Sequence, residues 1–149
     1  VHDPLFLYGH RRYEEVLGLH WMTPIYRDGH LYASSGRNEP DASFRCVDLL
    51  TGKLRWKHDQ AWTHRFGEPA PAKIYGRSSF VMADGKLIVL GETGKLGLFK
   101  MDTKKQTELS SYKHPNLHYP CWAGPALANK KLYIRSESHL ICLDIAKKR

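Results

Sequence analysis

Short apolar stretches alternate with tight turns along most of the chain. Three segments each predict two short strands joined by a two-residue turn, at residues 23–36, 79–91 and 124–136. The predicted turns are Asp28-Gly29, Asp84-Gly85 and Asn129-Lys130. Pairs that begin with Asp or Asn suit type I′ hairpins, because both central residues of that turn need a positive φ angle. The pattern therefore predicts three β-hairpins and an all-β fold.

A third strand that ends in an aspartate is expected after each hairpin. These strands cover residues 44–48, 98–102 and 140–144. A fourth strand is expected at 53–57 in the first copy and around 107–112 in the second, whereas the third copy reaches Arg149 without one. Such spacing agrees with the period of roughly 40–50 residues that is typical of a four-stranded β-propeller blade.

We therefore expect residues 1–149 to form part of one β-propeller domain, with about three blades of four antiparallel strands. The blades are expected at 19–58, 78–113 and 121–149, with connecting segments at 1–18 and 59–77. Within the first connecting segment, 5–8 could form an outer strand and 11–17 a short helix. Closed propellers have typically 4–8 blades, so three blades leave apolar lateral faces to be covered. We expect the chain to be part of a larger polypeptide or to assemble.

The most specific pattern follows the third strand of the first copy. Asp48 is followed by Thr51 and Gly52, and Trp56 comes four residues later. Aspartate accepts hydrogen bonds from nearby backbone N–H groups, and glycine adopts positive φ without steric cost, so both suit a turn. This spacing resembles the repeat of the pyrroloquinoline-quinone-like (PQQ-like) β-propellers. The resemblance implies that Asp48, Thr51 and Gly52 form a turn and that Trp56 docks between neighbouring blades.

The other two copies depart from this repeat. They carry Asp102-Thr103-Lys104 and Asp144-Ile145-Ala146, without the glycine or the tryptophan. The Leu-Tyr pairs at 31–32 and 132–133 still match the second strand of the family's repeat. Overall the chain is similar to the C-terminal part of bacterial propellers that resemble the outer-membrane-assembly lipoprotein. That resemblance implies a periplasmic or envelope-associated protein.

Two classes of function are compatible with this resemblance. A non-catalytic scaffold that binds another protein is favoured. The chain has the turn and strand residues of a structural repeat, but no recognisable set of catalytic or cofactor-binding residues. The alternative is a fragment of a PQQ-dependent alcohol or sugar dehydrogenase whose catalytic residues lie outside this chain, with PQQ and Ca²⁺ as cofactors. Enzymes of that kind carry a disulfide between adjacent cysteines, and no two cysteines are adjacent here. We assign no catalytic, cofactor-binding or metal-binding residue.

Composition and charge add a third alternative. The chain has 149 residues, of which 42% are apolar and 26% charged, as in a globular protein. Twenty-three Lys and Arg against 15 Asp and Glu give a net charge of +8, which would favour an anionic polymer as partner. The basic pairs are scattered along the chain, so nucleic acid is not the favoured partner.

No apolar run approaches the ~18 residues of a membrane-spanning helix. The expected partner is another protein, the remainder of the propeller, or a further copy of this chain.

The cysteines and histidines do not form a recognisable site. Cys46 and Cys142 occupy equivalent positions in separate blades, too far apart for a disulfide, and Cys121 adjoins Trp122. All three cysteines are expected to be buried free thiols. Two histidine pairs lack the spacing and the acidic residue of a zinc site, and we interpret them as loop or surface residues. These pairs are His58 with His64 and His114 with His118.

Overall fold

The computed structural model describes residues 16–36, 41–60 and 74–146, and these residues form eleven strands in three antiparallel sheets. Sheet 1 contains β1 (Ile25–Arg27), β2 (His30–Ser35), β3 (Ser43–Asp48) and β4 (Leu54–Asp59). Sheet 2 contains β5 (Ser78–Ala83), β6 (Lys86–Gly91), β7 (Lys95–Lys100) and β8 (Thr107–Lys113). Sheet 3 contains β9 (Ala126–Ala128), β10 (Lys131–Arg135) and β11 (Leu140–Asp144). Within each sheet, strands that follow one another in the sequence are also neighbours in space.

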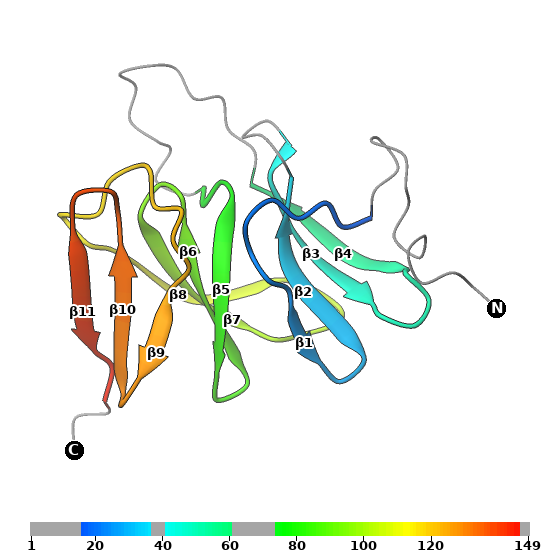
Figure 1. The fold of residues 1–149 in the computed structure, drawn as a ribbon. Helices are drawn as coiled ribbons and strands as arrows, with labels where there is room; N and C mark the ends of the chain where they lie inside the picture. Colours follow the sequence, from blue (N-terminus) through cyan, green and yellow to red (C-terminus); the bar gives the residue numbers. More distant parts are fainter. Residues whose placement is uncertain (1–15, 37–40, 61–73, 147–149) are drawn as a thin grey trace.

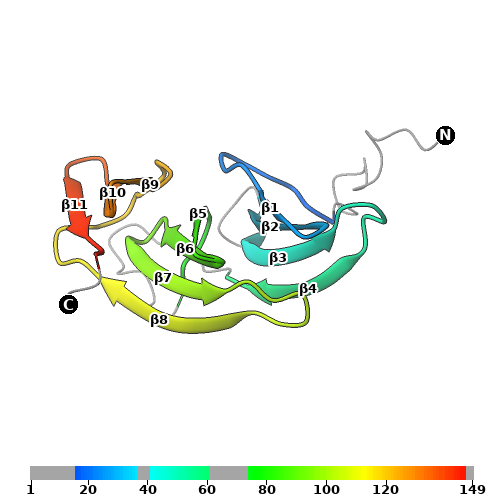
Figure 2. The ribbon, with the colours of Figure 1, turned by 90° about the horizontal axis from the view of Figure 1, so that it is seen from below.

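The three sheets stand side by side and are separate from one another (Figure 1). When the molecule is seen from below, β1, β5 and β9 lie on the inner side of an arc, whereas β4, β8 and β11 lie on its outer side (Figure 2). This is the arrangement of blades in a β-propeller. The chain is therefore all-β and forms a partial β-propeller, as the sequence predicted.

All three predicted hairpins are present, and they use the predicted turns. Asp28, Asp84 and Asn129 have φ angles of 48°, 47° and 50°. The second turn residues also have positive φ: 77° at Gly29, 67° at Gly85 and 61° at Lys130. Positive φ at both positions is the signature of the type I′ turn, whose twist matches that of the flanking strands. The three turns lie at the lower end of the sheets in Figure 1.

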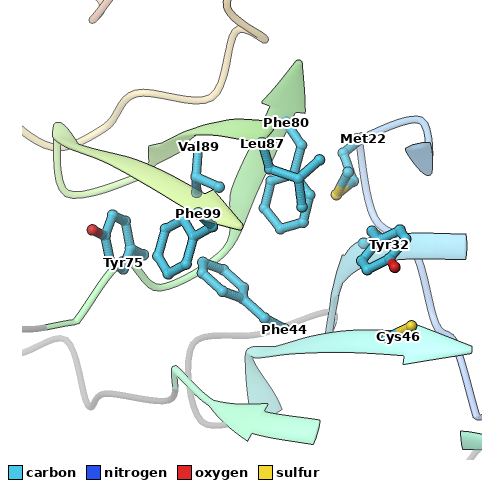
Figure 3. Packing of buried hydrophobic residues seen from close by; sticks show 10 residues of the cluster. Met22, Tyr32, Phe44, Cys46, Tyr75, Phe80, Leu87, Val89 and Phe99 are labelled. Carbon is cyan, nitrogen blue, oxygen red and sulfur yellow. The ribbon is translucent and has the colours of Figure 1, made fainter. Parts of the chain in front are cut away.

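Sheets 1 and 2 pack face to face through an apolar core that is rich in aromatic rings (Figure 3). Phe44 of β3 lies at its centre, with ring centroids 5.1 Å from Phe80 and 5.7 Å from Phe99, both edge-on. Tyr75 adds a further ring 5.6 Å from Phe44. The two edge-on pairs, Phe44 with Phe80 and Phe44 with Phe99, each add stability of about 0.5–1.5 kcal/mol beyond the burial of their surface.

Sheets 2 and 3 share a second core, which is aliphatic. The buried contributions from sheet 2 are Leu90 and Leu96, and those from sheet 3 are Leu132 and Ile134. Successive side chains of a strand point to opposite faces of its sheet. On β6, Leu87 and Val89 therefore pack toward sheet 1, whereas Ile88 and Leu90 pack toward sheet 3. Sheet 2 is thus covered by a sheet on each face, which is why β6 is almost continuously apolar.

The strand register aligns the three copies residue by residue and corrects one prediction. Asp48 pairs with the first residue of β2, and Asp144 pairs with the first residue of β10. The residue with the same partner in sheet 2 is Lys100, because β7 ends there and not at Asp102. Asp102 therefore lies two residues beyond the position that the sequence assigned to it.

The described part of sheet 3 has three strands, in agreement with the third copy of the repeat, for which the sequence predicted no fourth strand. Both predicted fourth strands are present elsewhere, as β4 and β8. The predicted strand at 5–8 lies outside the described residues, as does most of the predicted helix at 11–17, whose last two residues are not helical. Most of the connecting segment 59–77 also lies outside the described part of the chain.

Candidate protein-interaction site

The predicted turn motif lies between β3 and β4. The Asp48 carboxylate accepts a hydrogen bond of 2.9 Å from the backbone N–H of Thr51, and the Asp48 carbonyl accepts one of 2.9 Å from Gly52. Gly52 has a φ of 67°. The bond from Thr51 is the main reason why the pKa of the Asp48 carboxyl lies below its usual value. These contacts make the three residues one structural unit that reverses the chain.

Trp56 lies on β4 and faces sheet 2. Its indole N–H donates a hydrogen bond of 2.7 Å to the carbonyl of Asp102, in the connection between β7 and β8. Its ring lies 6.2 Å from the ring of Tyr32 on the same sheet. Trp56 therefore lies in the outer part of the space between two sheets and attaches one to the other.

A second group of side chains comes together at the opposite end of the sheets from the hairpin turns. Trp21, Arg77 and Trp122 each lie seven residues before the first turn residue of their own hairpin. These first turn residues are Asp28, Asp84 and Asn129. The repeat therefore brings one equivalent position from each sheet toward the common centre, and we call the group formed by Trp21, Arg77, Glu92 and Trp122 the axial cluster.

The axial cluster is built on a buried ion pair. The Arg77 guanidinium contacts the Glu92 carboxylate through Nη2 at 2.8 Å and Nε at 3.1 Å, and the Glu92 carboxylate also accepts the Arg77 backbone N–H at 2.7 Å. Glu92 is fully buried and the Arg77 side chain is 10% exposed. A paired arrangement with several hydrogen bonds is what a buried carboxylate requires, because removing one charge would leave the other unpaired.

Two tryptophans cover this ion pair. The guanidinium carbon of Arg77 lies 4.6 Å from the ring centroid of Trp21, a cation–π contact. The indole nitrogen of Trp122 lies 3.5 Å from a Glu92 carboxylate oxygen. The two indole rings are 5.9 Å apart. Arg77 therefore contacts the indole of Trp21, and Glu92 contacts the indole of Trp122, so the ion pair holds both rings in place.

The upper surface of the axial cluster is exposed. Trp122 is 46% exposed, although large aromatic side chains are usually well covered. Next to it lie Tyr119, with a ring 6.1 Å from Trp122, and His20, with a ring 4.7 Å from Trp21. Together they present aromatic side chains from segments that precede β1 and β9.

Sequence reasoning did not find the axial cluster, although a signal was present. Counting back seven residues from each turn would have aligned Trp21, Arg77 and Trp122. Glu92 could not be found in this way, because nothing in the sequence pairs it with Arg77. A buried carboxylate is recognised by its partners in space.

The cysteines differ from one another, which corrects the expectation that all three are buried. Cys46 and Cys121 are buried, whereas Cys142 is exposed. Burial raises the pKa of both buried thiols, Cys46 and Cys121, to about 11. Cys142 is exposed because its face of sheet 3 meets no other sheet in the described part of the chain.

The described residues contain no group of three or more His, Cys, Asp and Glu side chains that could hold a metal ion. Within the same residues there is no helix long and apolar enough to cross a membrane.

No protein family and no curated protein matches the chain. The computationally designed Ika4 protein is similar to it with a TM-score of 0.44 and 9% identity, over 87% of this chain and all of that one. BamB from Moraxella catarrhalis is similar with a TM-score of 0.46 and 13% identity, over 80% of this chain and 41% of that one. The assignment of the fold rests on the chain's own sheets and their arrangement.

Proposed function

We propose that this protein is a non-catalytic β-propeller scaffold that binds another protein through the axial cluster. The observation that carries the proposal is the exposed Trp122 indole, held beside the buried Arg77–Glu92 ion pair. Residues that dominate binding energy in protein interfaces are mostly Trp, Tyr and Arg in preorganised positions. The axial cluster offers two tryptophan rings that already contact the ion pair before a partner arrives.

We further propose that the chain belongs to a single propeller domain with PQQ-like repeats and acts at the bacterial cell envelope. Support for the repeat assignment comes from the Asp48–Thr51–Gly52 turn and from the contact of Trp56 with the neighbouring sheet. Support for the location comes from the resemblance of this motif alone. Fractionation of cells that make the protein, followed by immunodetection, would test it; recovery in the cytoplasm would contradict the proposed location.

The binding function can be tested with peptides displayed on phage. The library is selected on the wild-type protein, and the selected peptides are then measured on Trp122→Ala and on Leu50→Ala. Leu50 is a matched control, because it is 84% exposed in the β3–β4 connection, far from the axial cluster. We expect Trp122→Ala to weaken binding at least tenfold, in line with the ~2 kcal/mol of a hot-spot residue, and Leu50→Ala to change it less than twofold.

Two results would contradict the proposal. One is selected peptides that bind wild type, Trp122→Ala and Leu50→Ala with equal affinity. The other is a clear rise in melting temperature when PQQ and Ca²⁺ are added, since a ligand that binds the folded state stabilises it by mass action. That second result would favour the dehydrogenase alternative.

A further inference from the structure

Strand β8 is the outermost strand of sheet 2 and lies on the outer side of the arc (Figure 2). One of its edges pairs with β7, and the other pairs with no strand in the described part of the chain. This free edge belongs to a completed sheet of four strands. We propose that β8 pairs with β8 of a second copy of this chain, in antiparallel orientation about a two-fold axis. The proposal does not depend on the function proposed for the axial cluster.

The charges on β8 differ from those on β4, the outer strand of sheet 1. A two-fold pairing about the middle of β4 would place Arg55 opposite Lys57, or Lys57 opposite itself. Like charges in these positions oppose the pairing of two edges. By contrast, the only charged residues of β8 are Glu108 and Lys113, and the four residues between them are uncharged. The edge of β8 therefore lacks the protection that β4 has, and it carries opposite charges near its two ends.

The register of β8 with β7 shows that both charged residues share a face of the sheet. Glu108 pairs with Phe99, and Lys113 pairs with Lys95. Phe99 is part of the core toward sheet 1, and Nζ of Lys95 lies 4.3 Å from the ring centroid of Tyr75 in the same core. Residues that pair directly point to the same face. Glu108 and Lys113 therefore both face sheet 1, because a bulge adds one residue to the strand between them.

Two residues between these charges face the other way. Ser110 pairs with Leu98, and Tyr112 pairs with Leu96. Leu96 is part of the core toward sheet 3, and Leu98 lies two residues away on the same face. Ser110 and Tyr112 therefore both face sheet 3. Tyr112 is 51% exposed, so its ring is available to a second chain.

A two-fold axis through Ser111 makes the edge self-complementary. Counted along the ladder without the bulge residue Leu109, Ser110 of one copy lies opposite Tyr112 of the other. Glu108 of one copy then lies opposite Lys113 of the other, and the two-fold axis repeats each pair. Both pairs meet the condition that opposite residues share a face. The small serine leaves room for the tyrosine ring, and the bulges lie at the two ends of the pairing.

The two charged groups can make this contact without losing their contacts within the chain. The Glu108 carboxylate is 39% exposed and lies 3.8 Å from the Lys95 ammonium. A carboxylate has two oxygens, each of which accepts more than one hydrogen bond. Lys113 is exposed, and its ammonium donates to the Thr93 carbonyl. An ammonium has three N–H groups, so it can also donate to a carboxylate of the second copy.

The test measures the association of the whole chain by sedimentation velocity. One strand from each copy makes a small interface, so the dimer is weak, and about a hundredfold range of protein concentration is needed to follow it. The variants are Glu108→Lys, Lys113→Glu and the two changes combined, and the two single variants are also mixed. Lys57→Glu is the matched control, because it makes the same change of charge on exposed β4. Hydrogen exchange at low and high concentration shows which strand is covered.

We expect wild type to change from monomer to dimer as the concentration rises, with slower exchange at 107–113 and unchanged exchange at 54–59. Each single variant should dimerise about fivefold more weakly or worse, because it places like charges opposite each other at both ends of the pairing. The combined variant and the mixture should return to within about threefold of wild type, because both restore pairs of opposite charge. Lys57→Glu should change the association less than twofold.

Three results would overturn the proposal. One is a wild-type protein that stays monomeric at every concentration. Another is an equal effect of Lys113→Glu and Lys57→Glu, which would place the contact elsewhere on the molecule. The third is a mixture of the two single variants that associates no more tightly than either variant alone, because Glu108 and Lys113 would then not meet across two copies.

Discussion

At the scale of single residues, Trp56 makes the contact that attaches sheet 1 to sheet 2 on the outside of the arc. Replacement by alanine should lower the free energy of unfolding by about 2–3 kcal/mol, below the 3–5 kcal/mol of a fully buried aromatic because Trp56 is partly exposed. Trp56→Phe keeps part of the ring contact but loses the hydrogen bond to Asp102, so we expect a loss of about 1 kcal/mol. Urea denaturation measures both. A loss below about 0.5 kcal/mol for Trp56→Ala would contradict the role given to this side chain.

The cysteines give a prediction about reactivity. At pH 8 a thiol with a pKa of about 11 is deprotonated in only about one molecule in a thousand, and the thiolate is the reactive form. Cys142 should therefore react with a thiol reagent in seconds to minutes, and Cys46 and Cys121 much more slowly until the protein unfolds. Cys142→Ser should remove the fast phase. Three equal rates in the folded protein would contradict the burial of Cys46 and Cys121.

The cysteines also show that the sequence predicts equivalent positions in the repeat but not how far each residue is buried. Cys46 and Cys142 hold equivalent positions, and the sequence predicted the same burial for both. Their exposure differs because sheet 2 covers the face that carries Cys46, whereas no sheet covers the equivalent face of sheet 3 in the described residues. Burial depends on what lies opposite a residue, and a repeat pattern does not contain that information.

At the scale of elements, the hairpins were predictable because their signal is local. Asp-Gly pairs between two apolar strands specify the turn without help from the rest of the molecule. The end of β7 was not predictable in the same way. Both Lys100 and Asp102 could end the strand by their local chemistry, and the pairing of β6 with β7 is what selects Lys100.

The third hairpin turn is the one with a residue ill-suited to its conformation. Lys130 has a φ of 61°, a region that is unfavourable for a side chain with a Cβ atom, whereas the first two turns have glycine there. Lys130→Gly should raise the free energy of unfolding by about 0.5–1 kcal/mol. Lys131→Gly is the control, because Lys131 is the first residue of β10 and pairs with a neighbouring strand on each side, so glycine there should lower stability by about 0.5–1 kcal/mol. A loss of stability with Lys130→Gly, measured by thermal unfolding, would contradict the turn geometry.

At the scale of the whole molecule, the same repeat position has different surroundings in each sheet. Phe44, Leu96 and Leu140 are equivalent by register, and their exposed fractions are 2%, 6% and 74%. The first two face a neighbouring sheet, and the third faces none in the described residues. The sequence predicted that lateral faces of the outer sheets would need cover, but the register was needed to show which residues carry that face.

This difference can be measured. Leu96→Ala should lower the free energy of unfolding by about 2–5 kcal/mol, because it leaves a cavity between sheets 2 and 3. Leu140→Ala, the same change at the equivalent position, should stay within about 0.5 kcal/mol of wild type in the isolated chain. Denaturant unfolding of both variants gives the comparison. Similar losses for the two variants would show that another surface already covers the Leu140 face.

The central claim is that three separate sheets pack face to face around a common axis. Nuclear Overhauser effects in a spectrum of the labelled protein test this most directly. The account predicts contacts between the rings of Phe44 and Phe99 and between those of Trp21 and Trp122, whose centroids are 5.7 Å and 5.9 Å apart. Backbone contacts that pair β4 with β5 or β8 with β9 as neighbouring strands of one continuous sheet would contradict it.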